Sequence, residues 1–498
     1  MKLKKILKDI PSLSVKGSKD VLISGICANS KLVGPGNLFI AKRGKTQDGN
    51  AFISEAIAAG AVAVVTDIYN PALKDLVQII YQENQGQSLV EAEAQLVANY
   101  YQNPSDDLFM VGITGTSGKT TTAFLVKHLL EFLHVPCGLI GSIEYIIGNL
   151  HYKPTHTTPD LITNNKLLRE MLTQGCKAAV MEVTSHALDQ GRTANIEYDA
   201  AIFTNLTGDH LDYHQDMHTY SQAKAKLFKG LKTNKKKGPK LAIVNVDDVW
   251  HEQVASACNA AKLTYGINNT ADVQAKNIKL AAAGTSFELS YAGQTVSCHI
   301  PLVGRFNVYN SLAAACVGIH KGASLPVIAK CMQQFPAVPG RLEQVENPLG
   351  LKIFVDYSHK EDALRNVLET LREFKPARLF TVFGCGGDRD KTKRPKMAAV
   401  AEKYSDFTIV TTDNPRSEDP ETIVREIIAG FNSLENFCVK FDRRQAIEKA
   451  IEMSGPDDII LIAGKGHETY QIFAHRTIEF DDRAVAKELC SRMVQAKL

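Results

Sequence analysis

Short apolar runs rich in β-branched residues alternate with stretches of helical periodicity through the middle and the end of the chain. Such runs predict buried strands. Strands that alternate with helices form βαβ units, so the pattern predicts an α/β fold built on a mostly parallel sheet, with its functional loops at the carboxyl ends of the strands. The runs are 178–183, 200–203 and 241–244 in the middle of the chain, and 379–383, 407–410 and 459–462 towards its end.

The flanking segments show other patterns. In the first segment, β-like runs at 21–23, 37–40 and 61–65 precede a helical stretch that ends near Tyr101 and a linker-like composition at 103–107. Residues 277–301 alternate as in an antiparallel hairpin, and the turn composition of 338–341 marks a further boundary. Because 498 residues are too many for one core, we expect three domains, over 1–105, 106–340 and 341–498.

A glycine-rich turn follows the apolar run 109–113 and precedes a helical pattern at 123–130. A strand, a glycine turn and a helix start aim backbone N–H groups and the positive helix end at one point, which suits a polyphosphate. In the sequence Gly-Thr-Ser-Gly-Lys-Thr-Thr-Thr, residues 115–122, Lys119 can reach phosphates and Thr120 can hold Mg²⁺. Two residues separate the glycines, where the usual P-loop has four, and this spacing indicates a subset of ATPases.

Composition narrows the class of protein. The chain is 44% hydrophobic and 22% charged with a net charge of +3, which is typical of a globular protein and gives no support for nucleic-acid or membrane binding. Its start has no apolar signal segment and no apolar stretch is long enough to span a bilayer, so we expect a cytosolic protein. The ten cysteines are scattered without a CxxC pair, which favours buried thiols over disulfides or a zinc site.

Polar residues at the ends of the central strands are candidates for metal binding. Glu182 follows the apolar residues 179–181, and Asp209-His210 closes the segment 204–208, so Glu182 and His210 could both lie near the glycine turn as Mg²⁺ ligands. Residues 213–228 predict a helix with Tyr220, Lys224 and Phe228 on one face. An isolated lysine on a helix is normally a surface charge, so the role of Lys224 depends on the wider pattern.

That wider pattern resembles the Mur ligases, the ATP-dependent amino-acid-adding enzymes of peptidoglycan synthesis. The resemblance runs nearly from end to end. It is carried by the motifs at 114–121, 157–159, 181–186, 190–192, 203–206, 209–212, 304–310, 339–341, 384–390, 413–416 and 464–468. It implies an N-terminal UDP-substrate domain, a central ATP-binding domain and a C-terminal Rossmann-like domain that binds the amino acid.

The resemblance also implies a reaction. Asp-Asn-Pro-Arg at 413–416 is typical of the members that ligate meso-diaminopimelate to the D-glutamate γ-carboxylate of UDP-N-acetylmuramoyl-L-alanyl-D-glutamate. In these ligases ATP phosphorylates the carboxylate, and the amine of the amino acid then displaces phosphate from the acyl phosphate. Mg²⁺ and ATP are required, and we expect a monomer.

The resemblance assigns roles to residues of this sequence. Catalytic roles fall on Lys119, Glu182, His210 and Lys224, and the metal would be held by Thr120, Glu182, His210 and Lys224, the last as a carbamate formed with CO₂. ATP binding would involve Gly115, Thr116, Ser117, Gly118, Lys119, Thr120, Thr121, Asn307, Asn310, Arg341 and Asp356. The UDP-muramoyl dipeptide would contact Ser30, Thr157, Thr158, Thr184, Gln190 and Arg192. Diaminopimelate would contact Arg389, Asp413, Asn414, Pro415, Arg416, Gly464 and Glu468.

Some positions depart from the usual motifs, and other functions stay open. Residues 29–31 are Asn-Ser-Lys where Asp-Ser-Arg is usual, and Thr184 stands in place of serine. Residues 356–362 are Asp-Tyr-Ser-His-Lys-Glu-Asp, where the usual sequence is Asp-Tyr-Ala-His-Thr-Pro-Asp. A ligase that adds lysine or a folate glutamate tail should lack Arg416 and Glu468. A P-loop switch or transport ATPase would not explain Thr157, Thr158 or Lys224. A non-catalytic homologue should have lost Lys119 or Glu182.

Overall fold

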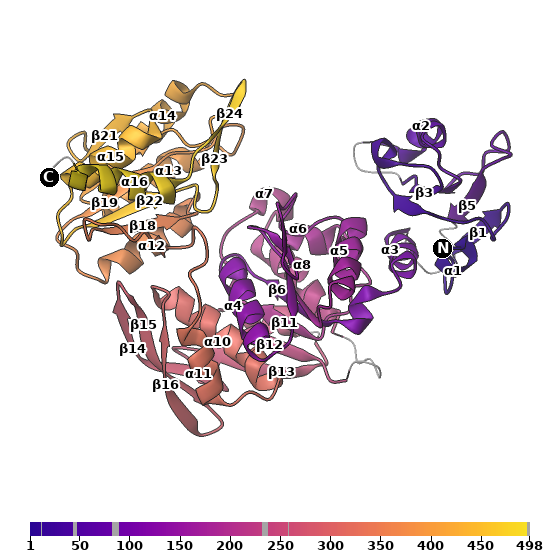
Figure 1. The fold of residues 1–498 in the computed structure, drawn as a ribbon, viewed down its shortest axis with the longest axis horizontal. Coiled ribbons are helices and arrows are strands. Elements are labelled where there is room, and N and C mark those ends of the chain that lie inside the picture. The colour runs from indigo at the N-terminus through magenta and orange to yellow at the C-terminus, as the bar shows by residue number, and fades with distance from the viewer. Residues whose placement is uncertain (11, 43–46, 82–88, 232–237, 257, 496–498) are drawn as a thin grey trace. The chain divides into compact units, whose positions relative to one another are not determined.

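The chain forms two compact units in a computed structural model, Met1–Thr264 and Tyr265–Leu498. The structure describes residues 1–10, 12–42, 47–81, 89–231, 238–256 and 258–495 (Figure 1). No helix of these ranges is both long and apolar enough to pass through a lipid bilayer.

The first unit begins with a small mixed sheet in the order β1-β5-β4-β3-β2, in which only β1 runs antiparallel to its neighbour. Its strands are β1 (Leu13–Lys16), β2 (Gly25–Cys27), β3 (Asn37–Ile40), β4 (Ala63–Thr66) and β5 (Val77–Tyr81), with helices α1 (Leu3–Ile6), α2 (Ile53–Ala58) and α3 (Leu89–Tyr100). The predicted strands at 37–40 and 61–65 are confirmed.

The strand predicted at 21–23 is wrong. Leu22 makes an isolated bridge with Lys2, while the neighbouring backbone bonds to the chain start through Leu3 N to Val21 O and Ile23 N to Met1 O. The Leu22 side chain is 67% exposed, so this apolar residue contributes little to the core.

The second sheet of this unit is mostly parallel. Strands β12, β11, β6, β10 and β7 lie side by side in parallel, and β8 and β9 extend the sheet in antiparallel fashion. The strands are β6 (Phe109–Thr114), β7 (Cys137–Ile140), β8 (Tyr145–Ile147), β9 (Leu150–Tyr152), β10 (Ala178–Glu182), β11 (Ala200–Phe203) and β12 (Leu241–Asn245). The helices are α4 (Lys119–Phe132), α5 (Leu161–Thr173), α6 (Ser185–Asp189), α7 (Leu211–His214), α8 (Met217–Lys229) and α9 (His251–Ala255). The predicted parallel α/β organisation is confirmed.

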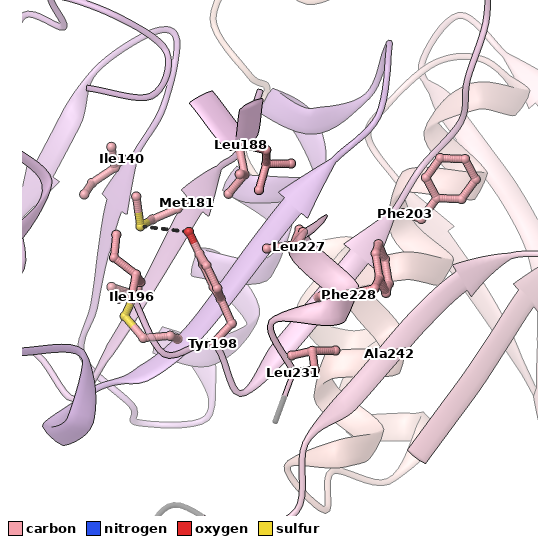
Figure 2. Packing of buried hydrophobic residues seen from close by; sticks show 14 of the residues in the cluster. Ile140, Met181, Leu188, Ile196, Tyr198, Phe203, Leu227, Phe228, Leu231 and Ala242 are labelled. Carbon is pink, nitrogen blue, oxygen red and sulfur yellow. Dashed lines mark hydrogen bonds between the residues drawn. The ribbon is translucent and has the colours of Figure 1, made fainter. Parts of the chain in front are cut away.

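Helix α8 is fixed to this sheet by apolar packing. Tyr220, Leu227 and Phe228 belong to the same buried cluster as Met181 of β10 and Phe203 of β11, and Figure 2 shows several of these side chains together. The single helix predicted over 213–228 is instead divided into α7 and α8. Gln215 takes a left-handed backbone with φ 68°, and the Asp216 carboxylate caps α8 by accepting from Thr219 N at 2.7 Å.

The second unit starts with an antiparallel sheet, as predicted for 277–301. Strands β14 (Val273–Ala281), β15 (Gly284–Tyr291) and β16 (Gln294–Ile300) form this sheet, and α10 (Arg305–His320) and α11 (Leu325–Gln333) follow them. Strand β13 (Ala261–Gly266) runs across the boundary between the two units.

The rest of the second unit is a Rossmann-like sheet in the order β17-β18-β22-β19-β20-β21, parallel except for β17. Its strands are β17 (Glu343–Gln344), β18 (Lys352–Asp356), β19 (Leu379–Phe383), β20 (Phe407–Thr411), β21 (Phe437–Lys440) and β22 (Ile459–Ala463), and β23 (Tyr470–Phe473) and β24 (Arg476–Glu479) form a separate hairpin. The helices are α12 (Glu361–Arg372), α13 (Lys393–Tyr404), α14 (Pro420–Ile428), α15 (Arg443–Met453) and α16 (Asp482–Gln495).

Of the ten cysteines, all but Cys27 and Cys438 are buried, so the prediction of buried thiols is confirmed.

Candidate active site

The glycine turn lies between β6 and α4 and is braced by the segment that follows β11. Thr116 N donates to Asn205 O and Ser117 N to Asn205 Oδ1, each at 2.9 Å. A Cβ at Gly115 would lie 1.8 Å from Thr204 Oγ1, so only glycine fits this turn. Lys119 Nζ folds back onto the turn and donates to Gly115 O at 2.8 Å and Thr116 O at 2.9 Å. The segment therefore has the strand, turn and helix arrangement of a phosphate-binding loop.

Glu182 lies directly beside this loop because β10 pairs in parallel with β6, with Glu182 opposite Ile113. Its carboxylate is 1% exposed and accepts from Thr120 Oγ1 at 2.9 Å, Ser142 N at 2.8 Å and Ser142 Oγ at 3.0 Å. A hydroxyl and a carboxylate are oxygen donors of the kind that Mg²⁺ prefers. The donor set formed by Thr120 and Glu182 therefore fits Mg²⁺.

Lys224 reaches the same loop from α8. It is 1% exposed, its Nζ donates to Gly115 O at 2.9 Å, and it lies 4.4 Å from the centre of the Tyr220 ring. Burial, reinforced by the nearby Lys119 cation, holds the pKa of Lys224 well below its ordinary value. Lys224 is therefore not a surface charge, and its amine is a buried group placed at the phosphate loop.

His210 belongs to an aromatic cluster beside this loop. It has a left-handed backbone with φ 57°, and its ring contacts those of His186 and Tyr220 at centroid distances of 4.8 and 6.3 Å. Tyr220 also joins this cluster to the loop, since its hydroxyl lies 3.3 Å from Thr116 Oγ1.

The residues expected to contact the UDP-muramoyl dipeptide form one group, except for Ser30. Thr158 Oγ1 donates to Glu182 O at 2.8 Å and accepts from Thr184 N at 3.1 Å, and Thr157 Oγ1 lies 3.1 Å from Ser142 Oγ. Arg192 donates to the Gln190 side chain at 2.6 Å and to Thr158 O at 3.3 Å. Ser30 begins a 3₁₀ turn, Ser30–Leu32, between β2 and β3, and its hydroxyl donates to Glu55 at 2.9 Å rather than to a residue of that group.

In the second unit, the residues expected to contact ATP lie on α10 and at the end of β18. Asn310 Nδ2 donates to Asn307 Oδ1 at 2.9 Å, and both side chains are buried. The Asp356 carboxylate accepts from Leu342 N at 2.7 Å, from Ser358 N at 2.8 Å and from the Ser358 hydroxyl. Burial raises the pKa of Asp356, while the Ser358 hydrogen bond and the Arg341 charge oppose this shift.

Arg341 lies 4.8 Å from the centre of the Tyr357 ring, so a cation–π contact joins the segments around β18. Next to it, the segments 338–341 and 464–467 approach each other closely. Gly340 has φ +63°, and a Cβ there would lie 2.0 Å from His467 N. A Cβ at Gly466 would lie 2.7 Å from Gly340 O.

The residues expected to bind diaminopimelate lie on three loops at the carboxyl ends of β19, β20 and β22. Asn414 Nδ2 donates to Glu468 Oε2 at 2.8 Å, and Arg416 Nη1 donates to Gly387 O at 2.7 Å. Asp413 lies against Gly464, where a Cβ would be 2.9 Å from Asp413 Oδ2. Pro415 is packed as tightly, because a Cβ at Gly387 would lie 1.9 Å from Pro415 O. Arg389 is exposed, and its Nη1 donates to Asp388 O at 2.9 Å.

Sequence reasoning missed two residues that hold these groups. Lys465 is fully buried, and its Nζ donates to Glu468 Oε2 at 3.1 Å, to Asn414 Oδ1 at 3.3 Å and to Tyr470 O. Ser142 supplies two of the hydrogen bonds to Glu182. A polar residue just after a buried strand was the available signal for both, because Lys465 follows β22 and Ser142 follows β7.

Comparisons with known proteins agree with this arrangement. Family models described as "Mur ligase family, catalytic domain", "Mur ligase middle domain" and "Mur ligase, glutamate ligase domain" match residues 22–101, 113–318 and 340–466. The chain is 44% identical to the UDP-N-acetylmuramoyl-L-alanyl-D-glutamate--2,6-diaminopimelate ligase of Chlamydia abortus, covering 99% of this chain and 100% of that protein. It is 41% identical to the ligase of the same name from Bacillus cereus, over 98% of both chains.

A solved structure of a ligase with that name superposes with a TM-score of 0.71 at 30% identity, over 99% of both chains. Since the matched segments, the full-length relatives and the strand-end loops agree, this chain belongs to the Mur ligase family.

Proposed function

We propose that this protein ligates meso-diaminopimelate to the D-glutamate γ-carboxylate of UDP-N-acetylmuramoyl-L-alanyl-D-glutamate in peptidoglycan synthesis, with conversion of ATP to ADP and phosphate. The observation that carries this proposal is that Arg416 and Glu468 lie on the loops after β20 and β22, which the hydrogen bond from Asn414 to Glu468 joins. The far end of diaminopimelate bears a carboxylate and an ammonium group. A guanidinium can bind the first bidentately and a carboxylate the second.

In the first unit, Lys119 would neutralise charge on the ATP phosphates, while the backbone N–H groups of the glycine turn orient them. Thr120 and Glu182 would hold Mg²⁺, with His210 and Lys224 contributing near the acceptor. When bound, Mg²⁺ supplies positive charge that screens the phosphates from the incoming carboxylate. In the second unit, Asn307, Asn310, Arg341 and Asp356 would contact the nucleotide.

The chemistry proceeds in two displacements. A γ-carboxylate oxygen of the D-glutamyl residue forms a bond to the γ-phosphorus, and the bond to the ADP oxygen breaks. The free amine of diaminopimelate then attacks the carbonyl carbon of this acyl phosphate, and the tetrahedral intermediate collapses with loss of phosphate. Phosphorylation converts a poor leaving group into a good one, so the residues of this chain have to align the reactants and stabilise charge.

Lys224 would act as a carbamate. A neutral amine adds to CO₂ by forming an N–C bond and releasing one proton to solvent, which turns a group that would repel Mg²⁺ into an anion. The burial of Lys224 favours this reaction, because a buried lysine loses its proton more readily than an exposed one. We further propose that the protein works as a monomer in the cytoplasm, with domains 1–105, 106–340 and 341–498 holding the UDP substrate, ATP and the amino acid.

A panel of amino acids tests this function. Purified protein is given ATP, Mg²⁺ and the UDP-muramoyl dipeptide, and ADP release is measured with meso-diaminopimelate, L-lysine or D-alanyl-D-alanine as the acceptor. Of the three acceptors, we expect only diaminopimelate to give rapid release of ADP. Equal release with lysine would contradict the substrate assignment, and release that needs no amino acid would contradict ligation.

A further inference from the structure

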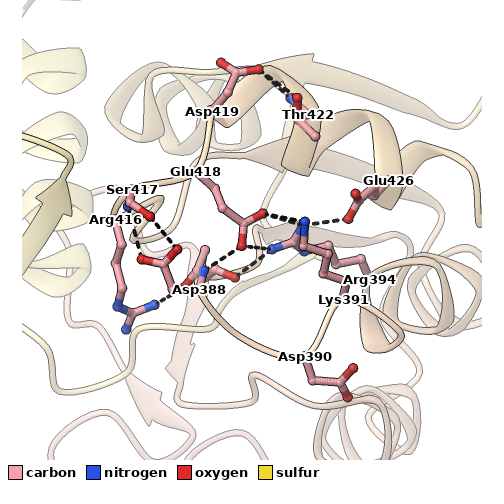
Figure 3. Close-up of polar contacts among 12 residues, drawn as sticks. Asp388, Asp390, Lys391, Arg394, Arg416, Ser417, Glu418, Asp419, Thr422 and Glu426 are labelled. Carbon is pink, nitrogen blue, oxygen red and sulfur yellow. Dashed lines mark hydrogen bonds and ion pairs between the residues drawn. The ribbon is translucent and has the colours of Figure 1, made fainter.

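The loops after β19 and β20 are joined by a network of polar contacts around Asp388 (Figure 3). The Asp388 carboxylate accepts from Ser417 Oγ at 2.6 Å and from Ser417 N at 3.2 Å. In the same loop, Gly387 N donates to Asn414 O at 2.9 Å and Gly387 O accepts from Arg416 Nη1 at 2.7 Å. Asp388 therefore binds Ser417, the residue after Arg416. Gly387, the residue before Asp388, binds the Arg416 side chain.

The backbone at both ends of this contact is constrained. Asp388 has φ 54° and Arg416 has φ 52°, and this left-handed region is sparsely populated by residues other than glycine, asparagine and aspartate. An arginine in that conformation persists where the surrounding contacts fix it. The fixing contacts are the Ser417 bonds to Asp388 and the bond from Arg416 N to Ile472 O at 3.0 Å.

An ion pair between a buried arginine and a half-buried glutamate anchors the other side of the β19 loop. Arg394 is fully buried and donates to Glu418 at 3.0 and 3.1 Å, and Glu418 in turn accepts from Asp388 N at 2.6 Å. Arg394 also donates to Gly386 O at 3.2 Å. The Arg394 hydrogen bonds lower the pKa of Glu418 to about 2, so this anchor keeps its charge at neutral pH.

From these contacts we infer that Asp388 is a positioning residue that holds Arg416 ready for the distal carboxylate of the amino acid. This inference rests on the proposed function. Arg416 uses Nη1 for Gly387 O, and no other described residue accepts from its Nε or Nη2. Those N–H groups remain for a carboxylate, provided that the loop keeps the guanidinium in place.

The test compares two variants that weaken the contact between Asp388 and Ser417 with one that leaves it intact. Asp388→Asn removes the charge while keeping a residue that tolerates the left-handed backbone, and Ser417→Ala removes the hydroxyl donor. Asp390→Asn is the matched control, because it removes one negative charge two residues away. The Asp390 carboxylate accepts from Thr392 N and Oγ1 and not from Ser417. All three are assayed for steady-state ligation and for unfolding temperature.

We expect Asp388→Asn and Ser417→Ala to raise KM for diaminopimelate about tenfold, the cost of a charge-assisted hydrogen bond, with little change in KM for ATP. Asp390→Asn should behave as wild type. In an Arg416→Ala background, Asp388→Asn should have no further effect, since both act through one side chain. Changes of less than twofold, equal rises in both KM values, or additive effects in that background would overturn the inference.

A measurement without substrate separates this inference from the proposed function. Hydrogen–deuterium exchange of peptides covering residues 414–418 should be faster in Asp388→Asn and Ser417→Ala than in wild type or Asp390→Asn. Unchanged exchange would refute the positioning role even if the protein ligates diaminopimelate. Faster exchange in a protein that ligates a different amino acid would refute the proposed substrate and leave the positioning role supported.

Discussion

Replacing Lys224 with methionine should stabilise the first unit and make its stability less dependent on pH. Lys224 is 1% exposed and its amine has a pKa lowered well below the ordinary value of 10.5. In the unfolded chain the amine is protonated up to pH 10.5. Folding therefore releases a proton wherever the pH lies between the two pKa values, and this release costs free energy.

The sign and size of the effect follow from that proton. The free-energy cost of burying the Lys224 amine is largest below the pKa of the folded protein, where the amine is charged in both states. The cost vanishes as the pH rises to the pKa of the unfolded chain, so the wild type gains stability with increasing pH. One proton corresponds to a slope of about 1.4 kcal/mol per pH unit. Lys224→Met keeps a long side chain in the same space and carries no titratable group. The variant should be more stable than wild type at pH 7, with an advantage that shrinks at up to that slope towards pH 10.

Trp250 provides the assay. It is the single tryptophan of the chain, and it packs against the apolar cluster that also contains Tyr220 and Phe228 of α8. Urea unfolding followed by its fluorescence thus reports on the surroundings of Lys224. The measurement is made between pH 7 and 10 in buffers free of CO₂, so that the amine stays unmodified. The reasoning would be refuted if the free energies of unfolding of the two proteins changed in parallel with pH, or if the stability advantage of Lys224→Met grew with pH.

Three further outcomes concern catalysis. Lys119→Ala should lower ADP release by at least about 10²-fold, with little change in the urea midpoint, because its Nζ donates to two carbonyls of the phosphate loop and packs in no apolar cluster of the described residues; near-normal turnover would exclude a phosphate-binding role. Arg416→Ala should reduce kcat/KM for diaminopimelate on the order of 10²-fold and change the slow reaction with lysine much less, and equal losses would exclude Arg416 as the specificity residue. Glu182→Gln should raise the Mg²⁺ concentration needed for half-maximal activity about tenfold or more, and an unchanged Mg²⁺ titration would remove Glu182 from the metal site.

The parallel sheets could be predicted because their signal is local. The runs 178–181 and 459–462 are apolar throughout, since both faces of these strands are buried, and β10 and β22 appear at those positions. The glycine turn at 115–118 was predictable for the same reason, because strand, turn and helix are contiguous in sequence.

Long-range contacts were not predictable in this way. The apolar run at 21–23 has the composition of a strand, yet its backbone pairs with the chain start, which no local pattern encodes. The break between α7 and α8 depends on the left-handed backbone of Gln215, a residue that usually continues a helix. Contacts such as Lys465 to Asn414 join residues 51 positions apart and become visible only when the loops of two strands meet.

Gly340 and Gly466 limit how this chain can change by mutation. Any side chain at Gly340 would overlap the backbone of His467, and one at Gly466 would press on Gly340 O and Tyr357. Backbone atoms cannot be moved aside by a rotamer change, so a compensating substitution nearby would not make room. A substitution at Gly340 or Gly466 that weakened the binding of an inhibitor to these two segments would therefore also destabilise the protein.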